Sequence, residues 1–225
     1  MEKKIKIVFE NENLMVIDKM AGITTTKERK GEEGTLEDLL IEEKGKNDLA
    51  RQGIVHRLDK GTSGLILVAK NEESLNNLKS QFKKREVIKK YLCLVEGDSS
   101  SKGSVQVPIG RSKYNFAKFR VGTEGKEAWT EFKKVENYEK GGKKYSLLEI
   151  NLKTGRSHQI RVHMSYLGWP LVGDKSYGGK VEELERPFLQ AKFISFKEPM
   201  SKEKLSFEVD LADDLKEALK NYEKV

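Results

Sequence analysis

The chain has 225 residues, of which 36% are hydrophobic and 35% are charged. This length allows a sizeable core, and a formal charge of +7 permits a phosphate-bearing partner without requiring one. Cys93 is the one cysteine, which excludes an intramolecular disulfide and favours a reducing compartment. No apolar run reaches the length of a signal peptide or a membrane span, so we expect a cytoplasmic protein.

The first part of the chain predicts short strands followed by two capped helices. Ile5–Phe9 and Leu14–Ile17 have the composition of a strand pair. Thr35 is a candidate N-cap for a helix with acidic residues in its first turn. The continuous apolar run Leu65–Ala69 predicts a buried strand, and Asn71 then predicts the cap of a second helix.

The second part of the chain adds further strands and two helices. Val87–Val95, with Cys93 as a small core residue, and Tyr145–Leu152 both predict strands. Helices are expected from Ser157, as the cap, to Leu167, and from Asp213 or Asp214 to Tyr222. Many strands with few helices predict an α+β fold with a mixed or mostly antiparallel sheet, in one domain over residues 1–225.

A glycine-rich stretch, Gly53–Gly64 (GIVHRLDKGTSG), lies between apolar segments. It places Asp59 at the mouth of a turn, because the residues around it are turn formers. One interpretation is structural, with Asp59 accepting turn amides and Arg57 pointing to water. The other is that the turn presents Asp59 in a site.

A second polar cluster, Lys153–His163 (KTGRSHQIRVH), follows the strand that ends near Leu152. The three histidines of the chain all fall in these two clusters. In a helix capped by Ser157, the side chains of His158 and Arg161 would fall in the first two turns. Their polar ends could then face a shared cleft.

Three common kinds of site fit these residues poorly. His158 and His163 are five residues apart and lack the acidic neighbour of a zinc-protease helix. Ser63 does not stand in the nucleophile-elbow pattern. The spacing from Gly168 to Gly173 suits a phosphate loop, but Asp174 occupies the position of the required lysine.

Two basic runs contain interleaved aromatic residues: Lys79–Tyr91 (KSQFKKREVIKKY) and Arg111–Arg120 (RSKYNFAKFR). Either run alone is most simply a solvated face. Together they favour phosphate contacts combined with base stacking, and hence an RNA or DNA partner.

The motifs taken together resemble the RluA-type pseudouridine synthases, which isomerise uridine in ribosomal or transfer RNA. The resemblance covers nearly the whole chain, in a fixed order of segments. The matching segments are Asn13–Gly22 (NLMVIDKMAG), Val55–Lys70 (VHRLDKGTSGLILVAK), Lys89–Gly97 (KKYLCLVEG), Leu152–Tyr177 (LKTGRSHQIRVHMSYLGWPLVGDKSY), Leu189–Phe196 and Leu205–Asp214.

The resemblance implies the pseudouridine synthase fold and an isomerisation that needs neither a cofactor nor a metal. It implies that Asp59 is the catalytic carboxylate and that Tyr91 stacks on the flipped base. Arg161 is expected to pair with Asp59, with Arg156 as the reserve, because an adjacent guanidinium stabilises an ionised carboxylate.

The resemblance also implies contacts with ribosomal or transfer RNA. Arg57 resembles the residue that fills the space left by the flipped base, although a phosphate contact is the alternative, and His56 either contacts RNA or holds the loop. The further RNA-binding candidates are Lys83, Lys84, Arg85, Arg111, Lys113, Lys118, Arg120 and Arg156.

A monomer without a separate N-terminal RNA-binding domain is expected. Two other classes of protein stay open from the residues alone. The first is a non-catalytic RNA-binding protein or RNA chaperone that retains the fold. The second is a metal-dependent nucleic-acid hydrolase that uses Asp59 and the histidines.

Overall fold

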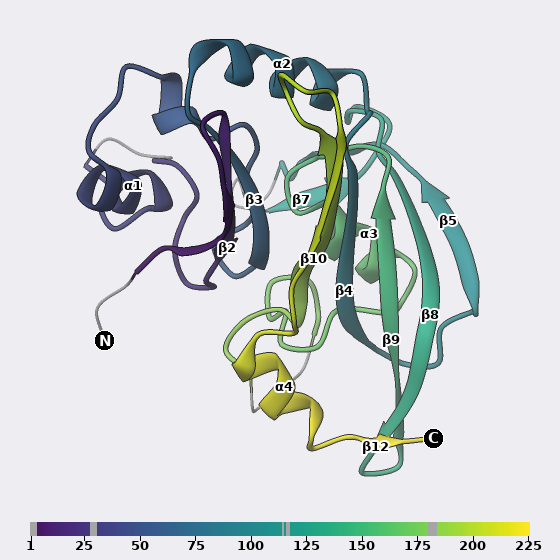
Figure 1. Cartoon of the computed structure of the whole chain (residues 1–225). Coiled ribbons are helices and arrows are strands. Elements are labelled where there is room, and N and C mark those ends of the chain that lie inside the picture. The colour runs from purple at the N-terminus through teal and green to yellow at the C-terminus, as the bar shows by residue number, and fades with distance from the viewer. Residues whose placement is uncertain (1–3, 28–30, 114, 116–117, 180–183) are drawn as a thin grey trace. The chain divides into compact units, whose positions relative to one another are not determined.

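The computed structural model describes residues 4–27, 31–113, 115, 118–179 and 184–225 (Figure 1). The chain forms two compact units, each built from two separate stretches. Unit 1 comprises Met1–Lys89 and Ala191–Asp210, and unit 2 comprises Lys90–Gln190 and Leu211–Val225. The predicted α+β class is confirmed, since every strand pair whose register is described is antiparallel.

Unit 1 combines a run of strands with two helices and a 3-10 turn. Within it the strands follow the order β1-β2-β3-β10, and β11 pairs with β10. The elements are β1 (Lys6–Glu10), β2 (Leu14–Lys19), α1 (Leu36–Lys44), η1 (Ala50–Gly53), β3 (Ser63–Ala69), α2 (Glu72–Lys83), most of β10 (Leu189–Lys197) and β11 (Lys204–Glu208).

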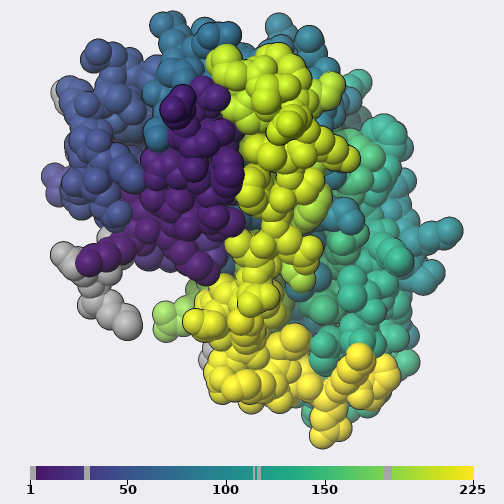
Figure 2. Space-filling model, viewed as in Figure 1, coloured from purple at the N-terminus to yellow at the C-terminus, as the bar shows by residue number. Residues whose placement is uncertain are grey.

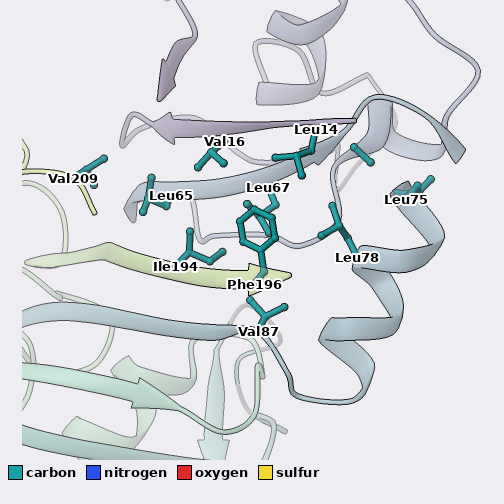
Figure 3. Close-up of a cluster of buried hydrophobic side chains, with 11 residues drawn as sticks. Leu14, Val16, Leu65, Leu67, Leu75, Leu78, Val87, Ile194, Phe196 and Val209 are labelled. Carbon is teal, nitrogen blue, oxygen red and sulfur yellow. The ribbon is translucent and has the colours of Figure 1, made fainter. Parts of the chain in front are cut away.

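The core of unit 1 lies where the strands meet helix α2. Figure 3 shows Leu67, Leu78 and Phe196 pointing toward one another in a cluster of buried side chains. Figure 2 shows the N-terminal strands beside the returning 191–210 segment. The rings of Phe9 and Phe207 lie 5.1 Å apart there. Residues distant in sequence therefore close this core.

Both helix caps predicted in unit 1 are confirmed. The Thr35 hydroxyl accepts the amide of Asp38, and the Asp38 carboxylate accepts the amide of Thr35, which together form a capping box. The Asn71 side chain accepts the amide of Ser74 at the start of α2. Local side-chain chemistry therefore marks where these helices begin.

Unit 2 contains a second run of strands, a separate hairpin and two helices. Within it the order is β4-β9-β8-β12, β5 pairs with β8, and β6 pairs with β7. The elements are β4 (Ile88–Glu96), β5 (Lys102–Gln106), β6 (Ile109–Arg111), β7 (Phe119–Val121), β8 (Trp129–Lys140), β9 (Lys143–Leu152), α3 (Gln159–Tyr166), α4 (Asp213–Leu219) and β12 (Glu223–Lys224).

The two predicted helices of unit 2 exist, but their ends differ from the prediction. His158, not Ser157, occupies the N-cap of α3, and it adopts a left-handed conformation with φ of 54°. Helix α4 ends at Leu219 instead of Tyr222. The ring of Tyr222 packs edge-on against Tyr145 at 4.8 Å, so a tertiary contact holds it outside the helix.

Cys93 is fully buried in β4, as predicted. Burial raises the pKa of its thiol above the ordinary range. Within the described ranges, no helix has the length and apolar character to cross a membrane.

Candidate active site

The turn that carries Asp59 is tied to neighbouring backbone on both sides. Within the turn, the Thr62 amide donates to the Asp59 carbonyl at 3.0 Å. The Gly22 amide donates to the carbonyl of Lys60, the residue after Asp59, at 2.8 Å. Asp59 itself is partly exposed. The turn therefore fixes the Asp59 backbone through hydrogen bonds between neutral groups.

Thr25 holds the residue that precedes Asp59. Its hydroxyl donates to the Leu58 carbonyl at 2.8 Å and accepts the Leu58 amide at 3.1 Å. Thr25 is fully buried and Leu58 nearly so. One side chain thus satisfies both backbone groups of a buried residue, which otherwise would lack partners.

The segment that includes Thr25 is itself organised by a buried lysine. Lys19, at the end of β2, is only 1% exposed. Its ammonium donates to the carbonyls of Met20 at 2.8 Å and Ile23 at 3.0 Å. A buried cation is tolerated where such acceptors surround it. Lys19 therefore shapes the chain that supports the Asp59 turn.

The glycine that follows this turn is required by a close backbone approach. Gly64 has a φ of 113°, and a Cβ there would lie 2.2 Å from the Ala191 carbonyl oxygen. Any side chain would push β3 away from the returning strand β10. This contact explains the glycine of the sequence TSG after Asp59.

His56 lies three residues before Asp59, and its ring makes structural contacts within unit 1. Its Nε2 accepts the Leu67 amide at 3.1 Å, so Nδ1 carries the proton of the neutral ring. The ring packs on Phe82 with centroids 4.7 Å apart. Burial, with the nearby charge of Lys89, lowers the pKa of His56 to about 3. Arg57, the next residue, is exposed.

The first basic run follows Phe82 at the end of helix α2. Lys83, Lys84 and Arg85 are all exposed, and Arg85 has a left-handed backbone with φ of 60°. Their positive charges interact favourably with the negative, C-terminal end of the helix dipole. Their position is compatible with RNA contact and with a simple solvated face, so the RNA role stays a prediction.

Arg161, on helix α3, is bound tightly within unit 2. Its Nε and Nη2 donate to the two carboxylate oxygens of Asp174 at 2.7 and 2.9 Å. Asp174 is 1% exposed. The guanidinium also lies over the Tyr177 ring, 4.8 Å from its centroid. This bidentate pair and the aromatic face together fix the orientation of the guanidinium.

Tyr177 also connects helix α3 to the β6–β7 hairpin. Its hydroxyl accepts the Phe119 amide at 2.9 Å and lies 2.8 Å from Nδ1 of His158. The Phe119 ring meets the His158 ring edge-on at 5.3 Å. The hairpin and the start of the helix therefore share one anchoring residue.

The remaining histidine has a structural role at the base of α3. His163 is fully buried, and its ring nitrogens lie 2.8 Å from the Thr130 hydroxyl and 3.0 Å from the Val107 carbonyl. Burial lowers the pKa of His163, partly opposed by the Val107 carbonyl. Within the described part of the chain, no group of three or more His, Cys, Asp or Glu side chains gathers as a metal site.

The second basic run forms the β6–β7 hairpin. The Arg111 guanidinium lies 5.2 Å from the centroid of the Phe119 ring, and Lys113 pairs with Glu124 at 2.9 Å. Lys118 is partly exposed and Arg120 is exposed. Two aromatic residues of this run, Tyr114 and Phe116, lie outside the described residues.

The other two candidates of unit 2 differ in burial. Tyr91 is 7% exposed in β4. Arg156 is partly exposed, and its Nε donates to the Glu127 carbonyl at 2.8 Å. Asp59 belongs to unit 1 and Arg161 to unit 2, so their expected pairing stays a prediction.

Four residues that support these candidates were not predicted from the sequence: Lys19 and Thr25 in unit 1, and Asp174 and Tyr177 in unit 2. A lysine in the apolar strand LMVIDK was an available signal for Lys19, because lysine is rarely buried without a purpose. The sequence interpretation considered Asp174 only as a defect in a phosphate loop. Nothing local to Asp174 or Tyr177 indicates that Arg161 is their partner.

Comparison with known proteins adds independent findings. The sequence profile of the family described as RNA pseudouridylate synthase matches residues 13–166. The uncharacterized RNA pseudouridine synthase YlyB of Bacillus subtilis is 36% identical, over 98% of this chain and 73% of that protein. The ribosomal large subunit pseudouridine synthase D of Pseudomonas aeruginosa is 35% identical, over 94% of this chain and 69% of that protein.

A solved structure supports the same similarity. Human RNA pseudouridylate synthase domain containing 1 superposes with a TM-score of 0.79 and 26% identity. The alignment covers all of this chain and 92% of the human one. The similarity therefore extends over both units and includes the Asp59 turn and helix α3.

Proposed function

The chain belongs to the RNA pseudouridylate synthase family and is of its RluA type, and from this premise we propose that it converts specific uridines of ribosomal RNA to pseudouridine with Asp59 as catalytic carboxylate. The observation that carries the assignment of Asp59 is its turn, which is fixed by Thr25 and Gly22 through the residues on either side. Ribosomal RNA is favoured by the names of similar proteins, with transfer RNA as the alternative.

The proposed reaction is an isomerisation in which nothing is gained or lost overall. The bond from the ribose C1′ to N1 of uracil breaks, the base rotates, and C1′ joins C5. The hydrogen on C5 leaves as a proton, and N1 takes up a proton. An ionised Asp59 would act either as the nucleophile at C1′ or as the base that removes a sugar proton. The proposal needs no redox cofactor and no metal.

We assign Arg161 as the partner that keeps Asp59 ionised and oriented. The ion pair with Asp174 engages Nε and Nη2 of Arg161. The other edge of the guanidinium, formed by its two terminal nitrogens, suits a second carboxylate. Asp174 and Tyr177 then act as positioning residues, because they hold Arg161 without touching the base. Arg156 is the weaker candidate, since its Nε already donates to the Glu127 carbonyl.

The remaining assignments concern the RNA. The uridine must leave its stack to reach Asp59, and Tyr91 would pack against the flipped ring. Arg57 would occupy the vacated space or bind a phosphate. The basic runs would bind backbone phosphates of the surrounding strand. The proposal includes a cytoplasmic, monomeric enzyme.

The test uses unmodified ribosomal RNA carrying tritium at C5 of its uridines. Joining C5 to the sugar expels this hydrogen, so tritium release into water measures the isomerisation. We expect release by the wild type in the presence of chelator and none by Asp59→Ala. RNA affinity of the variant should stay within about tenfold, because the substitution removes one side chain from a large polyanion interface.

Matched variants and substrates separate the alternatives. Asp48→Ala removes another carboxylate from an exposed site of the same unit and should keep full release. Release from transfer RNA alone would move the substrate to that class. Tight RNA binding without any release would favour the RNA-binding protein, and chelator-sensitive cleavage of the RNA without tritium release would favour the hydrolase. Full activity of Asp59→Ala would remove Asp59 from its role.

A further inference from the structure

Lys89 is a partly buried cation that forms no ion pair among the described residues. The residue lies at the start of β4, and its ammonium is 5.5 Å from the centroid of the Phe82 ring. Within the described parts of the chain, no carboxylate pairs with it. Its neighbour Lys90, by contrast, contacts the Glu149 carboxylate at 3.1 Å. Two adjacent lysines therefore have opposite electrostatic environments.

The groups around Lys89 cannot neutralise its charge. Phe82 presents only the face of its ring, and the same ring packs on His56. His56 accepts the Leu67 amide through Nε2, and a pKa of about 3 keeps it uncharged at neutral pH. A protonated His56 would repel Lys89. The neutral imidazole is thus compatible with the lysine but offers it no counterion.

An unpaired ammonium in such a place has an energetic cost. Burial lowers the pKa of Lys89 to about 8, because the charged ammonium is less well solvated there than in water. The group still remains mostly protonated at pH 7. A methionine would fill a similar volume without this cost, so packing alone gives no reason for a lysine.

We propose that Lys89 is a phosphate-binding residue that takes a backbone phosphate of the RNA, with Phe82 and His56 as the rigid wall behind it. This inference rests on the proposed function, because it takes an RNA strand as the ligand. The phosphate supplies the missing negative charge. Because Lys89 is partly exposed, the phosphate can approach it from solvent. The aromatic contact restrains the ammonium before RNA arrives.

The position of this site relates it to the catalytic motif. His56 stands three residues before Asp59, and Phe82 directly precedes the exposed basic residues Lys83 and Lys84. A phosphate held at Lys89 would lie between the segment that carries Asp59 and the basic end of α2. The site would therefore fix the register of the strand near the target nucleotide, and not merely raise general affinity.

The experiment compares Lys89→Met with Lys192→Met, since Lys192 lies outside both basic runs and pairs with Glu208 at 3.0 Å. Dissociation constants for the ribosomal RNA substrate are measured between about 50 and 200 mM salt, alongside C5 tritium release. We expect Lys89→Met to weaken binding about tenfold, because a charge-assisted contact is lost. The slope of log affinity against log salt should fall by about 0.7, the value of one phosphate on a single strand. Lys192→Met should stay within about twofold and keep the slope.

A second readout separates phosphate binding from a structural role. Only protonated Lys89 binds a phosphate, so wild-type affinity should fall as pH rises from 7 to 9, through the pKa of about 8. Phe82 does not titrate, and His56 stays neutral over this range. The fall should be smaller in Lys89→Met. The free variant should melt no lower than wild type, because an unpaired charge has been removed.

The outcomes distinguish this inference from the function beneath it. If the wild type binds and isomerises RNA while the two variants share its affinity and salt slope, Lys89 binds no phosphate. A lower melting temperature of Lys89→Met with an unchanged salt slope would reduce the lysine to a packing role. If the wild type itself neither binds nor isomerises RNA, the proposed function fails first.

Discussion

The Asp59 turn and the Arg161 helix are held in place by different forces. The turn of unit 1 is fixed by backbone hydrogen bonds and by the buried hydroxyl of Thr25. Arg161 of unit 2 is fixed by an ion pair with a buried carboxylate, Asp174, and by an aromatic face. Neutral contacts thus hold the backbone on either side of one proposed catalytic group, and charged contacts hold the side chain of the other.

This difference has a chemical consequence. Hydrogen bonds from neutral groups to the backbone around Asp59 set its position without competing for its negative charge. A guanidinium has two edges that can bind carboxylates. Asp174 engages one of them, so Arg161 can be held firmly and still suit a second acid.

The largest effect is expected for Arg161→Lys. A point charge replaces a planar fork, so the bidentate geometry toward Asp174 is lost. We expect kcat for C5 tritium release to fall by about a hundredfold or more, with RNA affinity little changed. The matched control is Arg186→Lys, since Arg186 forms a similar bidentate pair with Asp214 at 2.6 and 2.7 Å. A near-normal rate for Arg161→Lys would transfer the role to Arg156.

A smaller effect is expected for Thr25→Val, which removes a support of the Asp59 turn. The shape is kept, but both backbone groups of Leu58 lose their partner, at about 1–3 kcal/mol of unfolding free energy. We expect kcat to fall about tenfold while KM changes little. Thr24→Val is the control, because the Thr24 hydroxyl makes no hydrogen bond within the described ranges. Equal kcat values for the two variants would disprove the coupling.

Tyr177→Phe should have a still smaller effect and of a different kind. The ring stays beneath Arg161, while the hydroxyl that joins Phe119 and His158 is lost. We expect KM for RNA to rise about threefold with kcat nearly unchanged, because only the basic hairpin loosens. Tyr166→Phe, on an exposed ring, is the control. A selective loss of kcat would instead place the hydroxyl near the reaction.

The smallest effect concerns His56 and the pH dependence of stability. Its folded pKa of about 3 lies below the ordinary 6.5, so below pH 6.5 the unfolded chain binds a proton that the folded chain does not. The free energy of unfolding should therefore fall as pH decreases from about 6.5 toward 3. The slope is at most about 1.4 kcal/mol per pH unit for one proton.

His56→Gln checks this explanation in urea titrations. Glutamine can still accept the Leu67 amide but does not titrate, so the stability of the variant should depend less on pH. His163 has a lowered pKa as well and should supply part of the remaining slope. An unchanged slope in His56→Gln would show that the ring is protonated in the folded state.

Features of the fold with a local cause were predictable. Thr35 and Asn71 mark helix starts because their side chains reach amides three residues away. The apolar run of β3 indicates burial by itself. The start of α3 was missed because a tertiary network decides it. The Gln159 side chain binds Thr130 and the Trp129 carbonyl, and the chain enters the helix through a left-handed His158.

The candidate site was predictable only where a motif carries it. Asp59 and Arg161 were proposed from motifs that resemble those of the family, and their roles stay predictions. Asp174 was not, because thirteen residues separate it from Arg161 and no periodicity links the two. The long strand β8 was missed for a similar reason. Its sequence WTEFKKVENYEK is rich in charge, and pairing with β9 makes it a strand.

Because Cys93 is buried, thiol-directed probes can be attached at introduced cysteines without labelling the native one. The one cysteine of the chain is fully covered and its thiol resists ionisation, so alkylating dyes should leave the wild type unmodified. A cysteine introduced at Lys60 and another at Tyr166, both exposed positions, would then be the reactive pair. Fluorescence energy transfer between dyes at these positions would report how the separation of the two units responds to RNA.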